Sequence, residues 1–326
     1  MKKKLLFIAD SLKKVNLKSD SSLALAQVAL EENWQVFWCE AENLHFINDE
    51  LFVNNIFEII SLSINNLNYE LVNDTLTPFA TFDYCFIRKD PPFDESYKDL
   101  CWLLATQSKV KILNPPEMLL AYHEKSLQWK VYSAGAIKKE NLIPTCLSSD
   151  PNLITSYLEL HRDLFSNGIV CKPWLGHGGE DVQLFKSVEA LFHFFQQNLL
   201  NITSLPKYLI QPYLQEIHEE GDRRVLIANG EIIGDFVRLP AHGKIASNLA
   251  QGGTAIIREM TTEQIDICKN VANYLKYNNI IFAGLDLIGT KIGEINITSP
   301  TGLRTFENLT GKNIARKAFE LMVRIK

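Results

Sequence analysis

The sequence predicts a mixed α/β protein in which an amino-terminal parallel sheet is followed by two α+β units. Short apolar runs alternate with helix-like segments in the first third of the chain, a pattern that favours a parallel sheet. Adjacent prolines, Pro115 and Pro116, then interrupt the pattern, and strand-like runs dominate the last third. A chain of 326 residues accommodates about two or three such units. We therefore divide it into residues 1–122, 123–214 and 215–326.

The first unit opens with an apolar run over residues 4–9 that Asp10 ends. This run is too short for the core of a secretion signal, and we interpret it as the first buried strand. Residues 22–32 alternate apolar and polar positions at helical spacing, with Asp20 among three candidate N-caps. The remaining predicted elements of this unit are strands at residues 35–39 and 84–88 and a hairpin turn at residues 48–50.

The second and third units are expected to be mixtures of strands and helices. The predicted elements of the second unit are strands at residues 168–172, 182–185 and 208–211 and a helix at residues 190–198. Those of the third are strands across residues 222–240, a loop at 241–253, a helix at 263–278 and paired strands at 284–288 and 293–297.

Composition argues against several classes of protein. The net charge is −5 and the pI is near 5.9, so no overall basic field attracts nucleic acid. No apolar run approaches the roughly 20 residues of a membrane span. The six cysteines are scattered without a CxxC pair, which predicts neither a disulfide framework nor a zinc cluster. A cytoplasmic protein that binds neither nucleic acid nor membrane is expected.

A lysine at the end of a strand precedes a glycine-rich turn in the second unit. Lys172 is followed by Gly176, Gly178 and Gly179. Glycines let backbone N–H groups approach phosphate oxygens, and a lysine adds a positive charge. The alternative is an ordinary glycine hairpin between two strands. The spacing matches neither the P-loop nor the dinucleotide-binding fingerprint.

Three oxygen-bearing side chains are expected to converge in the last unit. Strand alternation puts Glu294 and Asn296 on one face, and Asp286 comes from the preceding strand, across a turn at residues 289–293. Oxygen ligands of this kind suit Mg²⁺ bound to nucleotide phosphates. A solvated acidic face is the alternative, although the apolar neighbours of these residues count against it.

A strand that contains Gln211 runs into Tyr213 and Leu214, and then into Glu219 and Glu220. Such a connection can offer backbone groups to an adenine and a carboxylate to a ribose. The adjacent arginines that follow, Arg223 and Arg224, could clamp phosphate or carboxylate. A merely charged turn is the alternative.

In this order, the pieces resemble the ATP-grasp arrangement, and the sequence resembles the prokaryotic glutathione synthetase family in particular. The stretches that carry the resemblance are Asp20-Ser21-Ser22, Arg88-Lys89-Asp90-Pro91-Pro92-Phe93-Asp94, Asn114-Pro115-Pro116, Lys172-Pro173 with the glycines of 176–179, Gly284-Leu285-Asp286 and Glu294-Ile295-Asn296-Ile297-Thr298-Ser299-Pro300-Thr301. They span nearly the whole chain. The implied fold is an amino-terminal parallel-sheet domain followed by a two-lobed ATP-grasp fold.

The resemblance also implies an activity. ATP would phosphorylate the cysteinyl carboxylate of γ-glutamylcysteine, and the amine of glycine would displace the phosphate to give glutathione. Two Mg²⁺ ions, or Mn²⁺, would bind with ATP. Homo-oligomers are usual in the family.

The roles that the resemblance implies fall into four groups. The residues expected to bind ATP are Lys125, Lys172, Gly176, Gly178, Gly179, Gln211, Tyr213, Leu214, Glu219 and Glu220. The expected metal ligands are Asp286, Glu294 and Asn296, and the expected catalytic residues are Arg224, Arg238 and Lys244. The expected substrate contacts are Ser21, Arg88, Asn248, Ser299 and Thr301. For Arg88, an ion pair with Asp90 or Asp94 is the structural alternative.

One loop departs from the family pattern. The family's lid loop is rich in glycine and carries an arginine, whereas this chain has Ala246 near the arginine position and fewer glycines around Gly243. Lys244 could supply the missing charge, but an ammonium lacks the fork of a guanidinium. Two alternatives therefore stay open: a ligase for another amine, and a nucleotide-binding protein without catalysis.

Overall fold

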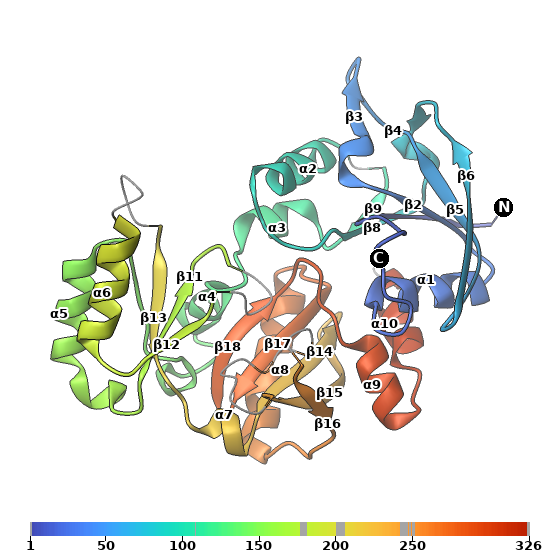
Figure 1. The fold of residues 1–326 in the computed structure, drawn as a ribbon. Coiled ribbons are helices and arrows are strands. Elements are labelled where there is room, and N and C mark those ends of the chain that lie inside the picture. Colours follow the sequence, from blue (N-terminus) through green and yellow to red (C-terminus); the bar gives the residue numbers. More distant parts are fainter. Residues whose placement is uncertain are drawn as a thin grey trace.

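The computed structural model describes residues 2–107, 109–176, 181–199, 206–241, 247, 249 and 252–324. The described strands form four sheets, with helices packed around the three larger ones (Figure 1). The mixed α/β class predicted from the sequence is confirmed. No helix in the described parts of the chain is both long and apolar enough to cross a membrane.

The amino-terminal sheet has six strands in the order β6-β5-β2-β1-β8-β9. Its strands are β1 (Lys4–Ala9), β2 (Gln35–Cys39), β5 (Ile56–Ser63), β6 (Asn66–Asn73), β8 (Tyr84–Arg88) and β9 (Lys111–Leu113). The four strands β2, β1, β8 and β9 are parallel, as predicted. The hairpin β5–β6 adds two antiparallel strands that the sequence analysis did not predict. The sheet is therefore parallel at its centre and mixed as a whole.

A small second sheet follows β2. It contains β3 (Leu44–Ile47), β4 (Glu50–Val53) and β7 (Thr77–Pro78). The predicted turn between β3 and β4 is confirmed: Asn48 and Asp49 have φ angles of 48° and 65°. Asparagine and aspartate tolerate this left-handed conformation better than most residues.

Helices cover both faces of the amino-terminal sheet. These are α1 (Ser21–Glu31) on one face and α2 (Glu95–Ala105) with α3 (Pro116–Ala121) on the other. The helix α1 starts one residue earlier than predicted, and its cap is Asp20, whose side chain accepts from the Leu23 backbone N–H at 2.7 Å. Along β1, Leu5 and Phe7 pack toward α1, whereas Leu6 packs toward α2. This alternation is expected for a strand buried on both faces.

The middle sheet has the order β10-β13-β11-β12 and carries its own apolar cluster. Its strands are β10 (Cys146–Ser148), β11 (Ile169–Pro173), β12 (Gln183–Phe185) and β13 (Tyr208–Pro212). The helices α5 (Pro151–Leu160) and α6 (Val188–Leu199) lie together on one side of it (Figure 1). The helix α4 (Leu127–Ser133) precedes this unit.

The carboxy-terminal sheet has the order β16-β15-β14-β17-β18, with all neighbours antiparallel. Its strands are β14 (Asp222–Ala228), β15 (Glu231–Leu239), β16 (Thr254–Ile256), β17 (Phe282–Ile288) and β18 (Lys291–Asn296). The helix α8 (Thr262–Tyr277) covers one face. On the other face, α9 (Leu303–Thr310) and α10 (Ile314–Val323) pack over Leu226 and Ala228, and so leave the Asp222–Arg224 end of β14 to the site described below.

Short helical segments complete the described chain. They are α7 (Glu216–Glu219) and the 3₁₀ turns Ala41–Asn43, Phe79–Thr81, Lys139–Asn141 and Arg162–Phe165. The apolar clusters of the amino-terminal and carboxy-terminal sheets are continuous with each other, whereas the middle sheet has a separate cluster. The division at residues 122 and 214 stays a prediction.

Candidate active site

Two arginines and an aspartate form the centre of the site, on one face of the carboxy-terminal sheet. The register of β14 and β17 places Arg224 opposite Asp286, and Nε and Nη2 of Arg224 donate to the two carboxylate oxygens at 2.6 and 2.9 Å. Nη2 of Arg238, on β15, lies 2.8 Å from Oδ2 of the same carboxylate. All three side chains are buried. Burial alone raises the pKa of Asp286, but the two guanidinium groups hold that pKa below its usual value.

Asp222 belongs to the same cluster, although the sequence analysis did not single it out. Its Oδ2 accepts from Nη2 of Arg238 and, at 3.0 Å, from the Ser247 hydroxyl. Burial raises the pKa of the Asp222 carboxyl to about 6, against the lowering effect of Arg238. The signal was available in the sequence, because Asp222 lies two residues before Arg224 on one strand and so shares its face.

Arg223 lies on the opposite face of β14. Its Nη1 donates to the Asp235 carboxylate and, at 2.8 Å, to the carbonyl of Arg258, while its Nη2 donates to the carbonyl of Glu259 at 3.0 Å. Side chains alternate across a strand, so only one of two adjacent arginines can reach the Asp286 side. Arg223 thus clamps the carboxylate of Asp235 within the fold and does not join Arg224 at Asp286.

The three predicted metal ligands lie on one face of the β17–β18 hairpin. Asp286 is opposite Glu294, and Gly284 is opposite Asn296. The turn is shorter than predicted, because β17 ends at Ile288 and β18 begins at Lys291, and Gly293 forms a bulge that keeps Glu294 in register. A side chain at position 284 would put its Cβ 2.9 Å from Nη1 of Arg224, so only glycine lets that guanidinium cross β17.

Two lysines of the middle unit lie near acids of the site: Lys172 interacts with the charge of Glu294, and Nζ of Lys125 lies 3.7 Å from Oε1 of Glu124. Lys172, near the end of β11, is half-buried; desolvation lowers its pKa, and the charge of Glu294 acts in the opposite direction. Nζ of Lys125 donates to the carbonyls of Gly176 and, at 3.2 Å, Trp174. The ammonium group of Lys125 is therefore at the start of the glycine-rich turn, and that of Lys172 is near Glu294.

Glu124 is a second residue that sequence reasoning missed. Its backbone carbonyl accepts from the Ile295 N–H at 3.1 Å, which fixes it beside Glu294. Burial raises the pKa of the Glu124 carboxyl to about 8, the charge of Glu294 raises it further, and Lys125 opposes the rise. Its place next to Lys125 in the sequence was the signal that could have found it.

The strand predicted to meet an adenine has most of its polar groups in use. The Gln211 amide donates to the Thr145 hydroxyl at 2.8 Å, and the Tyr213 N–H donates to the Gly168 carbonyl at 3.0 Å. The Tyr213 hydroxyl bonds to Nε2 of His218. Leu214 is half-buried at the end of this strand.

Glu219 and Glu220 lie farther along, at the end of α7. Both side chains are exposed, and both backbone carbonyls accept from Arg258 at 3.0 Å. Among the described residues, no hydrogen bond or ion pair joins either carboxylate to the arginine–aspartate cluster.

Residues expected to contact the substrates hold two parts of the chain together. Arg88 donates to the Ser22 hydroxyl and to the Pro300 carbonyl, both at 2.9 Å, instead of forming the alternative ion pair with an aspartate. The Ser21 hydroxyl accepts from the N–H groups of Gly302 and Leu303 at 3.0 and 3.2 Å.

Ser299 and Thr301 belong to the same connection after β18. The Ser299 hydroxyl donates to the Arg88 carbonyl at 3.3 Å, and the Thr301 carbonyl accepts from Nη1 of Arg224 at the same distance. The segment thus lies between Arg88 and Arg224.

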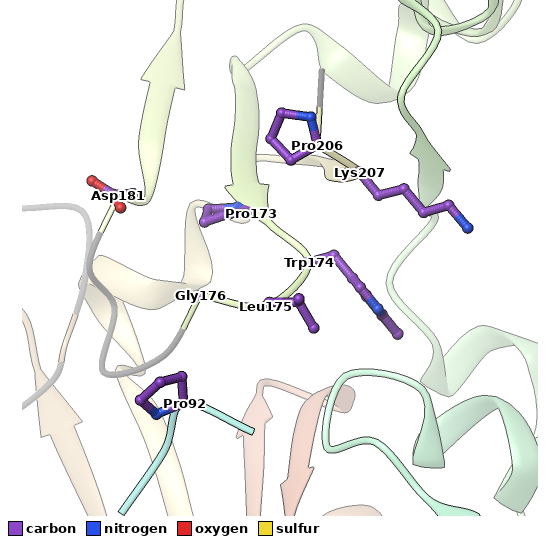
Figure 2. A pocket seen from close by; sticks show the side chains of 8 residues that line it. All are labelled: Pro92, Pro173, Trp174, Leu175, Gly176, Asp181, Pro206 and Lys207. Atoms are coloured by element: carbon purple, nitrogen blue, oxygen red, sulfur yellow. The ribbon is translucent and has the colours of Figure 1, made fainter. Parts of the chain in front are cut away.

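A cavity of about 580 Å³ opens beside the start of the glycine-rich turn. Figure 2 shows Pro92, from the amino-terminal unit, across the hollow from the segment that carries Trp174 and Leu175. The Trp174 ring stacks on His123, with 4.2 Å between ring centroids. The residues that line the cavity are Pro92, Pro173, Trp174, Leu175, Gly176, Asp181, Pro206 and Lys207.

Four predicted site residues lie outside the described parts of the chain. They are Gly178, Gly179, Lys244 and Asn248.

The donors on the hairpin suit a hard divalent cation if other ligands complete its shell. Within the described residues, no three histidine, cysteine, aspartate or glutamate side chains are grouped so as to hold a metal by themselves. Asp286 and Glu294 with the Asn296 amide supply oxygen ligands, which is the chemistry that Mg²⁺ and Mn²⁺ prefer. Such a site needs further oxygens, which nucleotide phosphates can provide.

Comparisons with known proteins match this chain to one family over nearly its whole length. Residues 3–119 match the family model of the prokaryotic glutathione synthetase N-terminal domain, and residues 136–311 match that of its ATP-grasp domain. The chain is 31% identical over 325 residues to a glutathione synthetase of Prochlorococcus marinus subsp. pastoris, covering 99% of both chains. It is 28% identical over 316 residues to one of Bradyrhizobium diazoefficiens, covering 95% of each.

Solved structures agree on the fold. D-cycloserine synthetase DcsG superposes with a TM-score of 0.67 at 13% identity, over 98% of this chain and 99% of that one. A RimK domain ATP-grasp protein from Sphaerobacter thermophilus superposes with a TM-score of 0.63 at 10% identity, over 98% and 99%. With an ATP-grasp fold, matches to both domain models and relatives aligned from end to end, the chain belongs to the prokaryotic glutathione synthetase family.

Proposed function

We propose that this chain is an ATP-dependent carboxylate–amine ligase that joins glycine to the cysteinyl carboxylate of γ-glutamylcysteine, giving glutathione, ADP and phosphate. Family membership supports the substrates. The observation that carries the chemistry is the buried Arg224–Asp286–Arg238 cluster, with two lysines near the same acids. Cationic side chains grouped with these acids suit a reaction in which negative charge moves between phosphate and carboxylate oxygens.

In the first step, a carboxylate oxygen of the dipeptide attacks the γ-phosphorus of ATP, the bond to the β–γ bridging oxygen breaks, and ADP leaves. Positioning and charge stabilisation supply most of the catalysis of such a transfer. Lys125 and Lys172 are our candidates for the phosphate-binding ammonium groups, since both lie at the glycine-rich turn. Gly176, Gly178 and Gly179 would offer backbone N–H groups there.

The divalent metal site is proposed for Asp286, Glu294 and Asn296, with Mg²⁺ as the first choice and Mn²⁺ as a substitute. Bound there with the nucleotide, two such ions would neutralise charge on the phosphates. Arg224 and Arg238 hold both oxygens of Asp286 in this structure. We therefore expect them to release an oxygen when the nucleotide and metal bind.

In the second step, the amine of glycine attacks the acyl carbon, and phosphate leaves from the tetrahedral intermediate. Arg224 and Arg238 are the proposed donors to the oxygens that gain charge, because their forked N–H groups match phosphate and carboxylate. Lys244 and Asn248 are proposed to act from the loop predicted at residues 241–253. Ser299, Thr301, Arg88 and Ser21 are proposed to define the acceptor side, where the 299–303 segment already contacts Arg224.

The nucleoside is proposed to lie along β13 and the residues that follow it, Tyr213 and Leu214. Gln211 would contribute through its backbone, since its side chain is bonded to Thr145. Glu219 or Glu220 would reach the ribose. We further propose a cytoplasmic homo-oligomer that uses small-molecule substrates and neither nucleic acid nor membrane.

A ligase for a different amine is the second candidate, because the lid sequence has Ala246 near the family's arginine position. Product masses decide between the two. Purified protein with ATP, Mg²⁺ and γ-glutamylcysteine is incubated with glycine, alanine, serine or β-alanine. A product that is heavier than the dipeptide by one glycyl residue, formed only with glycine, supports the first proposal. A preferred product from another amine overturns it.

A protein without catalysis is tested in the same assay with Glu294→Ala. ATP turnover by the wild type that disappears in this variant excludes that alternative. Absence of turnover in both, with all four amines, supports it.

A further inference from the structure

Asn114 connects the amino-terminal sheet to the hairpin that carries the acids. It follows β9 directly, and its side chain is 4% exposed. Its Nδ2 donates to the carbonyls of Phe282 and Ile297 at 2.7 and 2.6 Å. Its Oδ1 accepts from the N–H groups of Ile281 and Phe282, both at 2.8 Å.

These four hydrogen bonds use the whole capacity of a carboxamide, which has two N–H donors and two acceptor lone pairs. All four partners are backbone groups, and all lie at the open end of the β17–β18 hairpin. The last paired residues of that hairpin are Gly284 and Asn296. The Asn114 amide thus bridges the two strands just beyond the point where their own pairing ends.

The position of this bridge matters for the site. Ile297 follows Asn296 directly, and Phe282 lies four residues before Asp286 on a regular strand. The guanidinium of Arg88 lies over the Phe282 ring, 5.7 Å from its centroid. A single side chain therefore joins the strand of Asp286 to the strand of Asn296, beside an arginine of the amino-terminal sheet.

We propose that Asn114 is a positioning residue that holds the metal-binding hairpin at its working distance from the amino-terminal domain. The inference rests on the proposed function of Asp286, Glu294 and Asn296. Neither test substitution reproduces the pattern: aspartate has no donors for the carbonyls of Phe282 and Ile297, and alanine removes the partner of all four backbone groups.

The test compares Asn114→Ala and Asn114→Asp with a matched control, Asn141→Ala. Asn141 is also 4% exposed, and its Nδ2 donates at 3.3 Å to the Thr290 carbonyl, at the other end of the same hairpin. The first measurement is hydrogen exchange at the Ile281 and Phe282 amides. The second is Mn²⁺ affinity in the presence of ADP, by electron paramagnetic resonance. The third is kcat and KM for each substrate.

In Asn114→Ala we expect faster exchange at both amides, Mn²⁺ affinity weaker by about 10-fold, and a kcat that falls more than any KM rises. In Asn114→Asp the acceptor oxygens remain, so exchange changes less, but the Mn²⁺ affinity still falls. Asn141→Ala should leave Mn²⁺ affinity unchanged.

Unchanged Mn²⁺ affinity and kcat in a folded Asn114 variant would overturn the proposal, and so would an equal loss in Asn141→Ala. If Asn114→Ala does not fold, the aspartate variant decides alone. If the wild type binds Mn²⁺ with ADP but forms no glycyl product, the proposed function fails, while the affinity comparison still judges Asn114.

Discussion

The two faces of the carboxy-terminal sheet use the same ion-pair chemistry for different purposes. On the α8 side, Arg223 binds one carboxylate and two backbone carbonyls, all within its own unit. On the other side, Arg224 and Arg238 share Asp286, and Arg238 also binds Asp222. Lys172 and Glu294 interact with this second cluster as well.

We propose that the contrast separates a structural ion pair from a catalytic one. The acceptors of Arg223 belong to β15 and to the chain that leads into α8, so the pair closes one region of the fold. The acids around Arg224 and Arg238 come from two strands of the sheet, and their charges are shared among several cations. Groups held in such a shared network can exchange partners for a ligand, whereas a pair closed within the fold cannot do so without loss of stability.

The largest expected effect is on catalysis, in Arg224→Met. Loss of one guanidinium from the reacting oxygens should lower kcat by about 10²–10³-fold, the usual cost of a missing donor to a developing negative charge. Steady-state kinetics of glycine-dependent phosphate release measure it. A kcat within threefold of the wild type would mean that Arg224 is structural.

Arg223→Met is the matched variant on the opposite face. It should lower the free energy of unfolding by about 3–5 kcal/mol, because it leaves the Asp235 carboxylate without its guanidinium partner. The kcat of the folded protein should be unchanged. Urea unfolding and kinetics on the same preparation check both, and a loss of kcat like that of Arg224→Met would erase the distinction between the faces.

Glu124→Gln is expected to change how the free energy of unfolding depends on pH. Burial raises the pKa of the Glu124 carboxyl from an ordinary 4.5 to about 8 in the folded protein, so the folded state binds its proton more tightly. The stability that this carboxyl contributes is complete below pH 4.5 and is lost as the pH rises to 8. The glutamine variant should match the wild type at pH 4.5 and exceed it at pH 8 by on the order of 2–4 kcal/mol.

Unfolding of the protein without nucleotide or metal, followed at several pH values, measures this difference. A difference between Glu124→Gln and wild type that does not vary with pH would contradict the proposed environment of Glu124.

Ser21→Ala is expected to have the smallest effect. Its hydroxyl accepts from two N–H groups at the start of α9, so its loss should cost about 1 kcal/mol of stability, as for other helix caps. Thermal unfolding measures that cost. The KM for γ-glutamylcysteine, measured on the same variant, tests the proposed substrate role of Ser21: a rise would support that role, and an unchanged KM would leave the hydroxyl a structural group.

Much of this fold could be predicted because local patterns and tertiary structure agree. The apolar run of β1, the capped helix α1 and the turn at Asn48 are each set by residues close in sequence. The β5–β6 hairpin was missed because its strands carry exposed and half-buried residues without a clean alternation. Such a strand is stabilised by its place at a sheet edge, which no short segment encodes.

The site could be predicted residue by residue only where a motif marks it. The positions of the other site residues depend on how the strands pair. Side-chain alternation puts Arg223 and Arg224 on opposite faces, and the bulge at Gly293 aligns Glu294 with Asp286. Glu124 and Asp222 were missed because their importance comes from groups distant in sequence, Glu294 and Arg238. In the sequence, Asn114 indicated only the end of the amino-terminal unit, because the four backbone groups that it bonds lie more than 160 residues away.

The most direct test of the proposed function follows the transfer of a carboxylate oxygen from γ-glutamylcysteine to phosphate. γ-Glutamylcysteine labelled with ¹⁸O in its cysteinyl carboxylate is turned over with ATP, Mg²⁺ and glycine by the wild type, Arg223→Met and Arg224→Met, and the released phosphate is analysed by mass. Activation as an acyl phosphate predicts one ¹⁸O per phosphate in the wild type and Arg223→Met, with little product from Arg224→Met. Unlabelled phosphate from the wild type, or equal loss of product in both variants, would contradict it.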